Sequence, residues 1–186
     1  MLGEAKLTVP VVVRYCTEQD LPRLEWFGHQ RVLRSAMART FQRARAGEVA
    51  FLVAEMNGFP VARVSLDLVQ ARRQGVALLW SLAVMPNLQG LGIGTLLLEA
   101  GERVARAHGL TMVELAVAMD NQRAQRLYER LGYRVVGERI ESHTREVPQG
   151  GMRTVTERCR VLRKRLSDRL PAGGAAAPSR AENSRR

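Results

Sequence analysis

The amino-acid sequence predicts an α/β (α+β) fold, in which a mixed, mostly antiparallel sheet of six or seven strands is combined with helices. Two observations lead to this prediction. Strand-like runs in the first half flank a two-residue hairpin signal, which makes neighbouring strands antiparallel. The second half alternates strand and helix signals, as expected where helices connect the strands of a mixed sheet. With 186 residues, of which 46% are hydrophobic, the chain is long enough for one domain with a buried core.

The first half begins with one strand and two helical segments. The β-branched run over residues 11–15 predicts a strand. Thr17 is expected to cap a helix, with Asp20 three residues later as a variant of the capping box. A mixed helical stretch over residues 30–46 should then end at Gly47.

The following segments predict a β-hairpin and one more strand. Residues 49–55 and 61–66 have strand composition and flank Asn57-Gly58, a dipeptide that favours a two-residue turn. The polar and basic residues 70–75 predict a loop. The apolar run over residues 77–84 predicts a strand, which should stop before Pro86 because proline has no backbone N–H to donate.

Two helices are predicted in the second half of the chain. The first should end at Gly109, and the strand over residues 112–118 should follow it. Asp120 or Asn121 is expected to cap the second helix, which Gly132 should end. The first helix is predicted from a single apolar stripe with spacings of four and three: Ile93, Leu97, Ala100, Val104 and Ala107.

The C-terminal part should contain two strands and a tail. Residues 133–138 and 154–162 have the composition of strands. Beyond them the composition shifts to Ala, Gly, Pro, Ser and Arg, which bury too little apolar surface to offset the entropy of ordering. The sequence therefore predicts one domain over residues 1–166 and a disordered tail over residues 167–186.

The charge balance limits the partners that the chain is expected to have. The 29 Lys+Arg residues exceed the 18 Asp+Glu residues, which gives a formal net charge of +11. Such an excess can serve nucleic acid, a membrane surface or an anionic small ligand, or it can be a solvated surface. The aromatic content is only 5%, without interleaving of aromatic and basic residues, so no nucleic acid is expected as the main partner.

Membrane and secretory signals are not found in the sequence pattern. No stretch approaches the roughly 18 apolar residues that span a bilayer, so no membrane partner is expected. Glu4 and Lys6 interrupt the N-terminal region, unlike the apolar core of a signal peptide. Cys16 and Cys159 are too few for a disulfide framework, and we interpret them as reduced thiols of a cytoplasmic protein.

A glycine-rich loop follows the fourth predicted strand and leads into a helix. Its sequence is Gln89-Gly90-Leu91-Gly92-Ile93-Gly94-Thr95. Glycines let the backbone approach a ligand, and the free amides of the helix start favour an anion such as a pyrophosphate. A P-loop would need a lysine after the glycines, and a dinucleotide fold would need a third glycine where Thr95 stands. Glu114 falls about where a ribose-binding acid would be, but it is expected in mid-strand.

A second motif runs from Asn121 to Tyr133 along the next helix. Asn121 and Tyr128 are seven residues apart, so they share one face of that helix. A phenol that faces a ligand can act as a proton donor. The alternative interpretation is that Asn121 is a helix cap and Tyr128 is a core aromatic.

Together, the two motifs resemble those of the GCN5-related N-acetyltransferases, the GNAT family. Residues 89–94 are similar to the family's Gln/Arg-x-x-Gly-x-Gly/Ala loop, and residues 121–133 resemble its Asn-x-x-Ala-x-x-Leu-Tyr-x-x-Leu-Gly-Phe/Tyr segment. The resemblance covers about residues 11–166. It implies a sheet that is splayed between its fourth and fifth strands, with helices on both faces. It also implies transfer of acetyl from acetyl-CoA to a primary amine of a small molecule or peptide, and it leaves a homodimer open.

The resemblance further implies a role for each matching residue, and no metal. The backbone of Leu82, Ala83 and Val84 would pair with the pantetheine arm, and an amide at or beside Val84 would stabilise the oxyanion. Asn121 would bond the pantetheine or its neighbouring backbone. Tyr128 would protonate the leaving CoA thiolate as the general acid. The pyrophosphate would be held by the loop and the start of the helix: Gln89, Gly90, Leu91, Gly92, Ile93, Gly94 and Thr95.

The motifs do not identify the general base that must deprotonate the amine. Family members carry a glutamate at one of two strand positions, where this chain has Leu78 and Ala116. This departure keeps a non-catalytic acyl-CoA-binding regulatory module open as the alternative function. The remaining candidates for the base are an ordered water and four side chains: Glu25, His29, Asp67 and Glu114.

The acceptor amine is not named by the sequence. In the family, the first helices and the last strands set the choice of acceptor, which here correspond to residues 24–46 and 140–152. The arginines of the first segment suit an acidic or carboxylate-bearing acceptor better than a polyamine, unless they are simply solvated: Arg31, Arg34, Arg39, Arg43 and Arg45.

Overall fold

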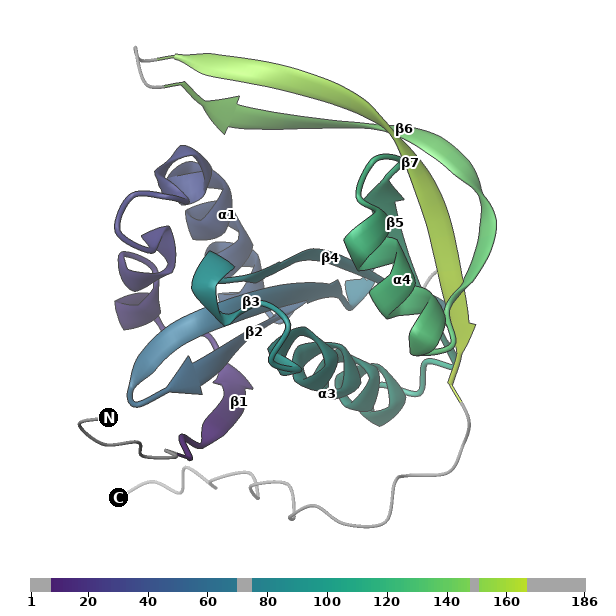
Figure 1. The fold of residues 1–186 in the computed structure, drawn as a ribbon, viewed down its shortest axis with the longest axis horizontal. Helices are drawn as coiled ribbons and strands as arrows, with labels where there is room; N and C mark the ends of the chain where they lie inside the picture. The colour runs from purple at the N-terminus through teal and green to yellow at the C-terminus, as the bar shows by residue number, and fades with distance from the viewer. Residues whose placement is uncertain (1–7, 70–74, 148–150, 167–186) are drawn as a thin grey trace, which may run out of the picture.

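A computed structural model gives the fold of the protein and describes residues 8–69, 75–147 and 151–166 (Figure 1). Within these residues, seven strands form one sheet in the order β1-β2-β3-β4-β5-β7-β6. Strands β4 and β5 run parallel, and every other neighbouring pair is antiparallel. The predicted mixed, mostly antiparallel sheet is therefore confirmed. Most of the loop predicted over residues 70–75, and the tail predicted over 167–186, lie outside the described residues.

The predicted hairpin is formed by β2 and β3. Strand β1 (Val11–Tyr15) pairs with β2 (Val49–Met56), which turns back into β3 (Phe59–Asp67). Asn57 and Gly58 at the turn have φ angles of 50° and 72°. Left-handed φ at both turn positions matches the strand twist, which explains why this dipeptide joins the two strands.

The segment between β1 and β2 is less regular than predicted. Asp20 accepts hydrogen bonds from the backbone N–H of Thr17 at 2.7 Å and from its hydroxyl at 2.8 Å, so the predicted cap is present. It starts a single 3-10 turn, and Pro22 follows directly after that turn. The helical elements here are η1 (Glu18–Asp20), η2 (Arg23–Glu25), η3 (Arg31–Leu33) and α1 (Arg34–Arg45).

The second half follows the predicted alternation of strands and helices. The apolar stripe of the first helix is buried from Ile93 to Ala100, whereas Ala107 at its predicted end is exposed. The last two strands are longer than predicted. The elements are β4 (Val76–Val84), η4 (Pro86–Leu88), α3 (Ile93–Ala107), β5 (Met112–Ala118), α4 (Gln122–Arg130), β6 (Arg134–Glu146) and β7 (Met152–Arg165).

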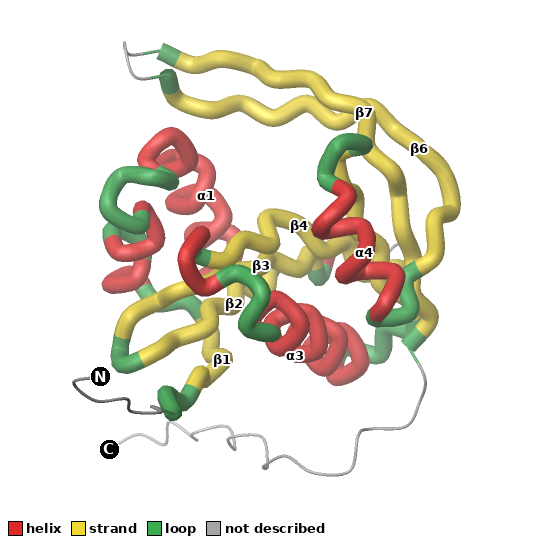
Figure 2. Tube along the Cα trace, viewed as in Figure 1, coloured by secondary structure: helices red, strands yellow, loops and turns green. Residues whose placement is uncertain are grey.

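Helices cover both faces of the sheet, as expected (Figure 2). Alternate residues of β2 point to opposite faces, which gives the sheet two apolar surfaces. Phe51 and Val53 pack with Met37 and Phe41 of α1 on one face. On the other face, Leu52 belongs to the cluster that α3 and α4 cover. Strands β6 and β7 extend beyond this core as a long antiparallel pair that arches towards α1 (Figure 1).

Strands β4 and β5 separate along their length, as predicted. Their pairing runs from Val76 opposite Met112 to Leu79 opposite Leu115, and β4 then continues alone to Val84. A β-bulge lies at this point, where the register of β4 against β3 shifts and Ser81 takes a φ of 59°. Bulges bend and twist a strand, so the bulge turns the end of β4 away from β5.

Leu166 is the last described residue, and it is packed into the domain. Its side chain is 4% exposed, and its N–H donates to the carbonyl of Thr111 at 2.7 Å. We predict that a chain ending at Leu166 keeps the melting temperature of the full chain. Ending it at Arg165 should lower that temperature by roughly 4–8 °C, because a buried leucine is worth at least about 2 kcal/mol.

Differential scanning calorimetry of the two shortened chains and the full chain checks this prediction. Equal melting temperatures for the two shortened chains would contradict the role of Leu166. A marked loss in the chain that ends at Leu166 would show that residues 167–186 dock on the domain.

Candidate active site

A cleft of about 580 Å³ opens where β4 and β5 separate. Most of its lining residues come from the free end of β4, the loop that leads into α3, and one face of α4. The side chain of Leu91 is 69% exposed and that of Ile93 is packed in the core, so neither lines the cleft. The other predicted site residues all lie in its walls: Leu82, Ala83, Val84, Gln89, Gly90, Gly92, Gly94, Thr95, Asn121 and Tyr128.

The end of β4 presents backbone groups to the cleft. The N–H of Met85 donates to the carbonyl of Val61 on β3 at 2.9 Å. Because backbone groups alternate along a strand, those of Leu82 and Val84 point the other way, towards the cleft. The carbonyl of Val84 accepts a hydrogen bond from Gln89 Nε2 at 3.1 Å. The N–H of Val84 therefore faces the cleft as well.

The loop before α3 provides an anion site of main-chain amides. Gly92 precedes the first residue of α3 with a φ of 84°, which a residue with a Cβ rarely adopts. The amides that begin α3 have no partner within the helix, and the helix dipole adds partial positive charge there. Thr95 lies in the first turn of α3 and also lines the cleft.

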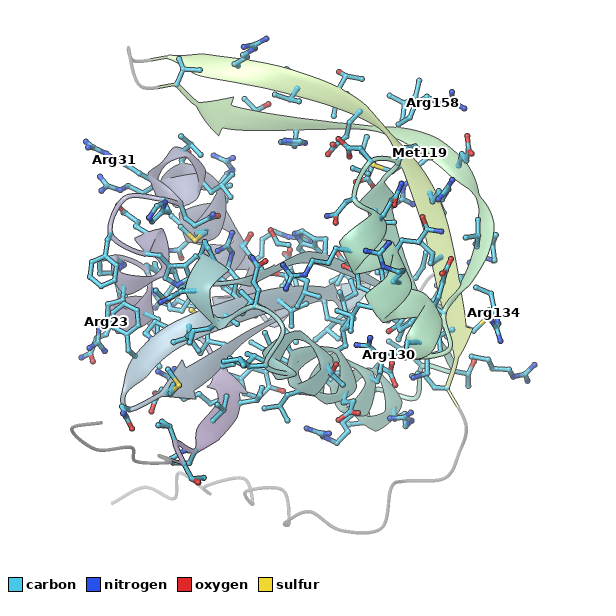
Figure 3. All side chains as sticks on the ribbon, viewed as in Figure 1. Arg23, Arg31, Met119, Arg130, Arg134 and Arg158 are labelled. Atoms are coloured by element: carbon cyan, nitrogen blue, oxygen red, sulfur yellow. The ribbon has the colours of Figure 1, made fainter. Side chains whose placement is uncertain are left out.

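Three arginines of α4 add positive charge to the cleft, and the sequence analysis missed them. Arg123, Arg126 and Arg130 line it and are three and four residues apart, so they share a face of α4. Arg123 Nη1 donates to the Oε1 of Gln89 at 2.9 Å, which ties α4 to the loop. Figure 3 shows Arg130 beside the C-terminal end of α4. Their spacing within the second motif is the signal that could have identified them.

Tyr128 lies at the inner wall of the cleft and also belongs to the core. It is 6% exposed and packs edge-on against Tyr133, with ring centroids 6.0 Å apart. Burial raises the pKa of Tyr128 to about 12, so its hydroxyl is protonated at neutral pH. Asn121 caps α4 by accepting from the N–H of Ala124 at 3.1 Å, and it lines the cleft as well. The geometry therefore fits both interpretations. Asn121 is a helix cap that also lines the cleft, and Tyr128 is a core aromatic that also lines it.

The end of the cleft opposite α4 contains Trp26 and Gln30, which no local motif marked. Trp26 and Phe27 have φ angles of 45° and 59°, which are rare for bulky residues. The indole of Trp26 is buried, and its Nε1 donates to the carbonyl of Pro60 at 2.9 Å. Such strained backbone persists where contacts hold it, and it is concentrated at functional sites.

None of the four candidate bases lines the cleft. His29 is exposed. The other three candidates are carboxylates that arginines bind outside the cleft wall. Arg34 lowers the pKa of Glu25 by hydrogen bonding to its charged form. Among the residues that the structure describes, no Asp, Glu or His forms part of the cleft wall. The carboxylate contacts are Glu25 with Arg34 at 2.5 Å, Asp67 with Arg43 at 2.7 Å, and Glu114 with Arg139 at 2.8 Å and Arg163 at 2.7 Å.

The five arginines expected to face an acidic acceptor do not line the cleft either. Arg34 and Arg43 are held in ion pairs with Glu25 and Asp67. All five are exposed, and Figure 3 shows Arg31 projecting away from the cleft. These five side chains therefore add no positive charge to the wall of the cleft.

Cys16 and Cys159 are both unpaired. Across residues 8–69, 75–147 and 151–166, no three His, Cys, Asp or Glu side chains are grouped closely enough to hold a metal ion. The helices in these ranges are too short or too polar to cross a membrane.

Known proteins share both the sequence pattern and the fold. A model of the acetyltransferase (GNAT) family matches residues 17–133. An uncharacterized N-acetyltransferase of Methanocaldococcus jannaschii is 33% identical over 111 residues, which are 58% of this chain and 45% of that protein. The chain therefore spans less than half the length of this relative.

This chain matches almost the whole length of two solved structures that have the same fold. A ribosomal-protein-alanine N-acetyltransferase from Brucella melitensis superposes with a TM-score of 0.63 at 21% identity, over 83% of this chain and 99% of that one. An N-acetyltransferase from Thermoplasma acidophilum, solved in complex with coenzyme A, gives a TM-score of 0.63 at 15% identity, over 84% and 99%. At these identities, the likeness establishes the fold alone.

Proposed function

The chain belongs to the acetyltransferase (GNAT) family, and from this premise we propose that it transfers the acetyl group of acetyl-CoA to a primary amine of a small molecule or peptide. One observation supports the proposal most strongly. The unpaired end of β4, the amides that begin α3 and the hydroxyl-bearing ring of Tyr128 all meet in one cleft. These are the groups that an extended thioester, its pyrophosphate and its leaving sulfur require.

Acetyl-CoA is proposed to lie along the cleft from α3 to Tyr128. The pantetheine arm would pair with the backbone of Leu82 and Val84, in place of the missing strand neighbour. The pyrophosphate would lie at the amides between Gln89 and Thr95. Arg123 stands beside that loop, and its charge favours a polyanionic ligand over a neutral one.

The proposed reaction is a direct attack of the amine on the thioester carbonyl. The C–N bond forms first and gives a tetrahedral intermediate whose oxygen carries the negative charge. The C–S bond then breaks as the carbonyl re-forms and the thiolate leaves. The N–H of Val84 would stabilise that charge. Tyr128 would supply a proton to the departing thiolate, and the proton lost by the amine would restore the tyrosine through solvent. Alignment of the two reactants in one cleft supplies several kcal/mol of the acceleration.

An ordered water is proposed to remove the proton of the attacking amine. This assignment follows from the contacts of the candidate side chains. Glu25, Asp67 and Glu114 are each bound by at least one arginine, and none of them reaches the cleft. A side chain that does not reach the cleft cannot take the proton of an amine bound there directly.

Isothermal titration with acetyl-CoA, followed by a thiol-release assay with a panel of amines, tests the proposed function. We expect saturable binding and CoA release that depends on both the protein and the amine, with the acetylated amine identified by mass spectrometry. Binding without release for every amine would favour the non-catalytic acyl-CoA-binding module. Absence of binding would contradict both functions.

A cytoplasmic location is also proposed, since the two free cysteines fit a reducing compartment. A homodimer stays a prediction that sedimentation can test.

A further inference from the structure

Arg63 on β3 is a buried cation that has no carboxylate partner among the described residues. The residue is 2% exposed, and its Nε and Nη1 have no hydrogen-bond partner. Its Nη2 donates to the Oε1 of Gln30 at 3.0 Å, and its guanidinium stacks over the ring of Trp26 at 5.2 Å. Burial lowers the pKa of Arg63 to about 10, so it is still charged at neutral pH. Buried arginines are normally paired, so this one has unused binding capacity.

The guanidinium lies directly behind one end of the cleft. Trp26 and Gln30, its two contacts, are both part of the cleft wall. Arg63 is also the cross-strand partner of Ala83, which lines the cleft. Directly opposed residues of an antiparallel pair point to the same face, so the side chain of Arg63 emerges beside Ala83.

Other arginines of the same layer are already neutralised. Arg14 bridges Asp20 and Glu55, and Arg43 contacts Asp67. The nearby carboxylates are therefore taken. No carboxylate of the described residues pairs with Arg63, which leaves its charge available to an anion from outside them.

We propose that Arg63 binds the carboxylate of the acceptor, so that the acceptor is a primary amine that also carries a carboxylate. The inference rests on the proposed function. The amide oxygen of Gln30 now occupies one donor of the guanidinium, as a neutral substitute for a carboxylate oxygen. Gln30 lies in the short turn before η3 and is only half-buried, so its side chain can rotate away when the stronger acceptor arrives.

A second unpaired polar group lies on the same face of β3. The hydroxyl of Ser65, two residues beyond Arg63, is buried and has no hydrogen-bond partner in the part of the chain that the structure describes. Residues two apart in a strand point to the same side, so Ser65 is placed to donate to the same carboxylate or to a water beside it. The Nε and Nη1 of Arg63 and the hydroxyl of Ser65 are thus three buried groups without a hydrogen-bond partner among the described residues.

The position of Arg63 also limits the size of the acceptor. The acetyl group is proposed to lie beside Val84, one residue from Ala83, and Arg63 is directly across from Ala83. The attacking amine and the carboxylate thus belong to one compact unit. Two sources share this chemistry: a free amino acid, and a peptide whose first residue is acidic.

The first experiment compares matched acceptors in the wild-type protein and in Arg63→Met. The acceptors are free amino acids, their carboxamides, and dipeptides that begin with an acidic or a neutral residue. We expect kcat/KM for the preferred carboxylate acceptor to fall about thirtyfold in the variant, as for loss of a charge-assisted hydrogen bond. The value for the matched neutral amine should change less than about twofold, and the Kd for acetyl-CoA should be unchanged.

The second experiment keeps Arg63 but changes the side chain that is bonded to its guanidinium. Gln30→Glu should give Arg63 a permanent internal carboxylate and abolish the preference for carboxylate acceptors, without loss of melting temperature. Arg39→Met, which removes an exposed arginine of α1, is the matched control and should leave the preference unchanged. Gln30→Glu also covers the case in which Arg63→Met does not fold.

The outcomes separate this inference from the proposed function. Equal kcat/KM for carboxylate and carboxamide acceptors in the wild type would overturn the role of Arg63, while acetyl transfer itself would stand. An equal loss for both acceptor types in Arg63→Met would show that Arg63 only supports Trp26. Calorimetry with the same amino acids on CoA-loaded protein provides a readout without turnover. Carboxylate-dependent binding that Gln30→Glu removes, but without transfer, would uphold the subsite and contradict the enzyme.

Discussion

Replacing Tyr128 with phenylalanine is expected to lower the turnover number roughly a hundredfold, the low end for general-acid catalysis, because a thiolate is a moderate leaving group. The ring of Tyr128 packs in the core and against Tyr133, and phenylalanine preserves that packing. Removal of the hydroxyl should therefore leave the melting temperature and the Kd for acetyl-CoA nearly unchanged. Stopped-flow or steady-state thiol release, measured on the same preparation as the melting curve, checks both parts.

The raised pKa of Tyr128 bears on how it can act. At about 12, it is well above that of a thiol, near 8.5, so full proton transfer to a free thiolate is uphill. In the proposed mechanism, the hydroxyl would stabilise the sulfur by a hydrogen bond as charge develops, and the transfer would be completed as the amine loses its proton. Because the neutral form persists to high pH, ionisation of Tyr128 should not limit turnover below about pH 10.

Tyr133→Phe is the matched control for this experiment. It also removes a single hydroxyl from a buried ring, but Tyr133 does not line the cleft. Its hydroxyl donates to Glu102 at 3.1 Å, so its loss should cost about 1 kcal/mol of stability with turnover intact. A Tyr128→Phe protein with wild-type turnover and a lowered melting temperature would make Tyr128 a core residue only, and the non-catalytic module would then gain support.

The sequence motifs predicted most of the residues on the proposed cofactor side of the cleft, because that side is built from local backbone. A glycine-rich loop between a strand and a helix creates free amides whatever the surrounding fold is. Asn121 and Tyr128 share a face because one helix carries both. Even so, the motif did not distinguish the side chains that face the cleft from those that do not, as Leu91 and Ile93 show.

The proposed acceptor side of the cleft could not be predicted, since it depends on contacts between distant segments. Trp26 and Gln30 reach the cleft through a strained turn, and Arg63 reaches them from a strand more than thirty residues later. The expectation that the arginines of residues 24–46 serve the acceptor rested on composition, which does not show that Arg34 and Arg43 are already paired.

The lengths of β6 and β7 were underestimated for a related reason. Their outer parts are polar, and the apolar alternation that marks a half-buried strand is weak there. The two strands stabilise each other through cross-strand polar pairs instead. Arg158 donates to Glu138 at 2.7 Å, and Ser142 lies 3.1 Å from Thr156 between hydroxyl oxygens.

Placing a carboxylate at the start of α3 should abolish acetyl-CoA binding. We expect Gly92→Glu to weaken the affinity more than about a hundredfold, because the new charge competes with the pyrophosphate for the same amides and repels it. Gly92 is a better position for this substitution than Gly94. A Cβ on Gly94 would already lie 3.5 Å from Leu127, whereas a Cβ on Gly92 meets nothing within 4 Å. Isothermal titration with acetyl-CoA measures the effect.

Backbone strain has to be separated from the loss of the site, since Gly92 has a φ of 84° and any side chain there is unfavourable. Gly109, just beyond the other end of α3, has a φ of 72° and equally open space around its Cα. Gly109→Glu should therefore lower the melting temperature about as much as Gly92→Glu and leave the affinity for acetyl-CoA intact. Gly92→Gln separates bulk from charge, and it should bind more tightly than Gly92→Glu and more weakly than the wild type. If Gly92→Glu binds acetyl-CoA as well as Gly109→Glu does, the loop before α3 is a structural turn and the pyrophosphate is bound elsewhere.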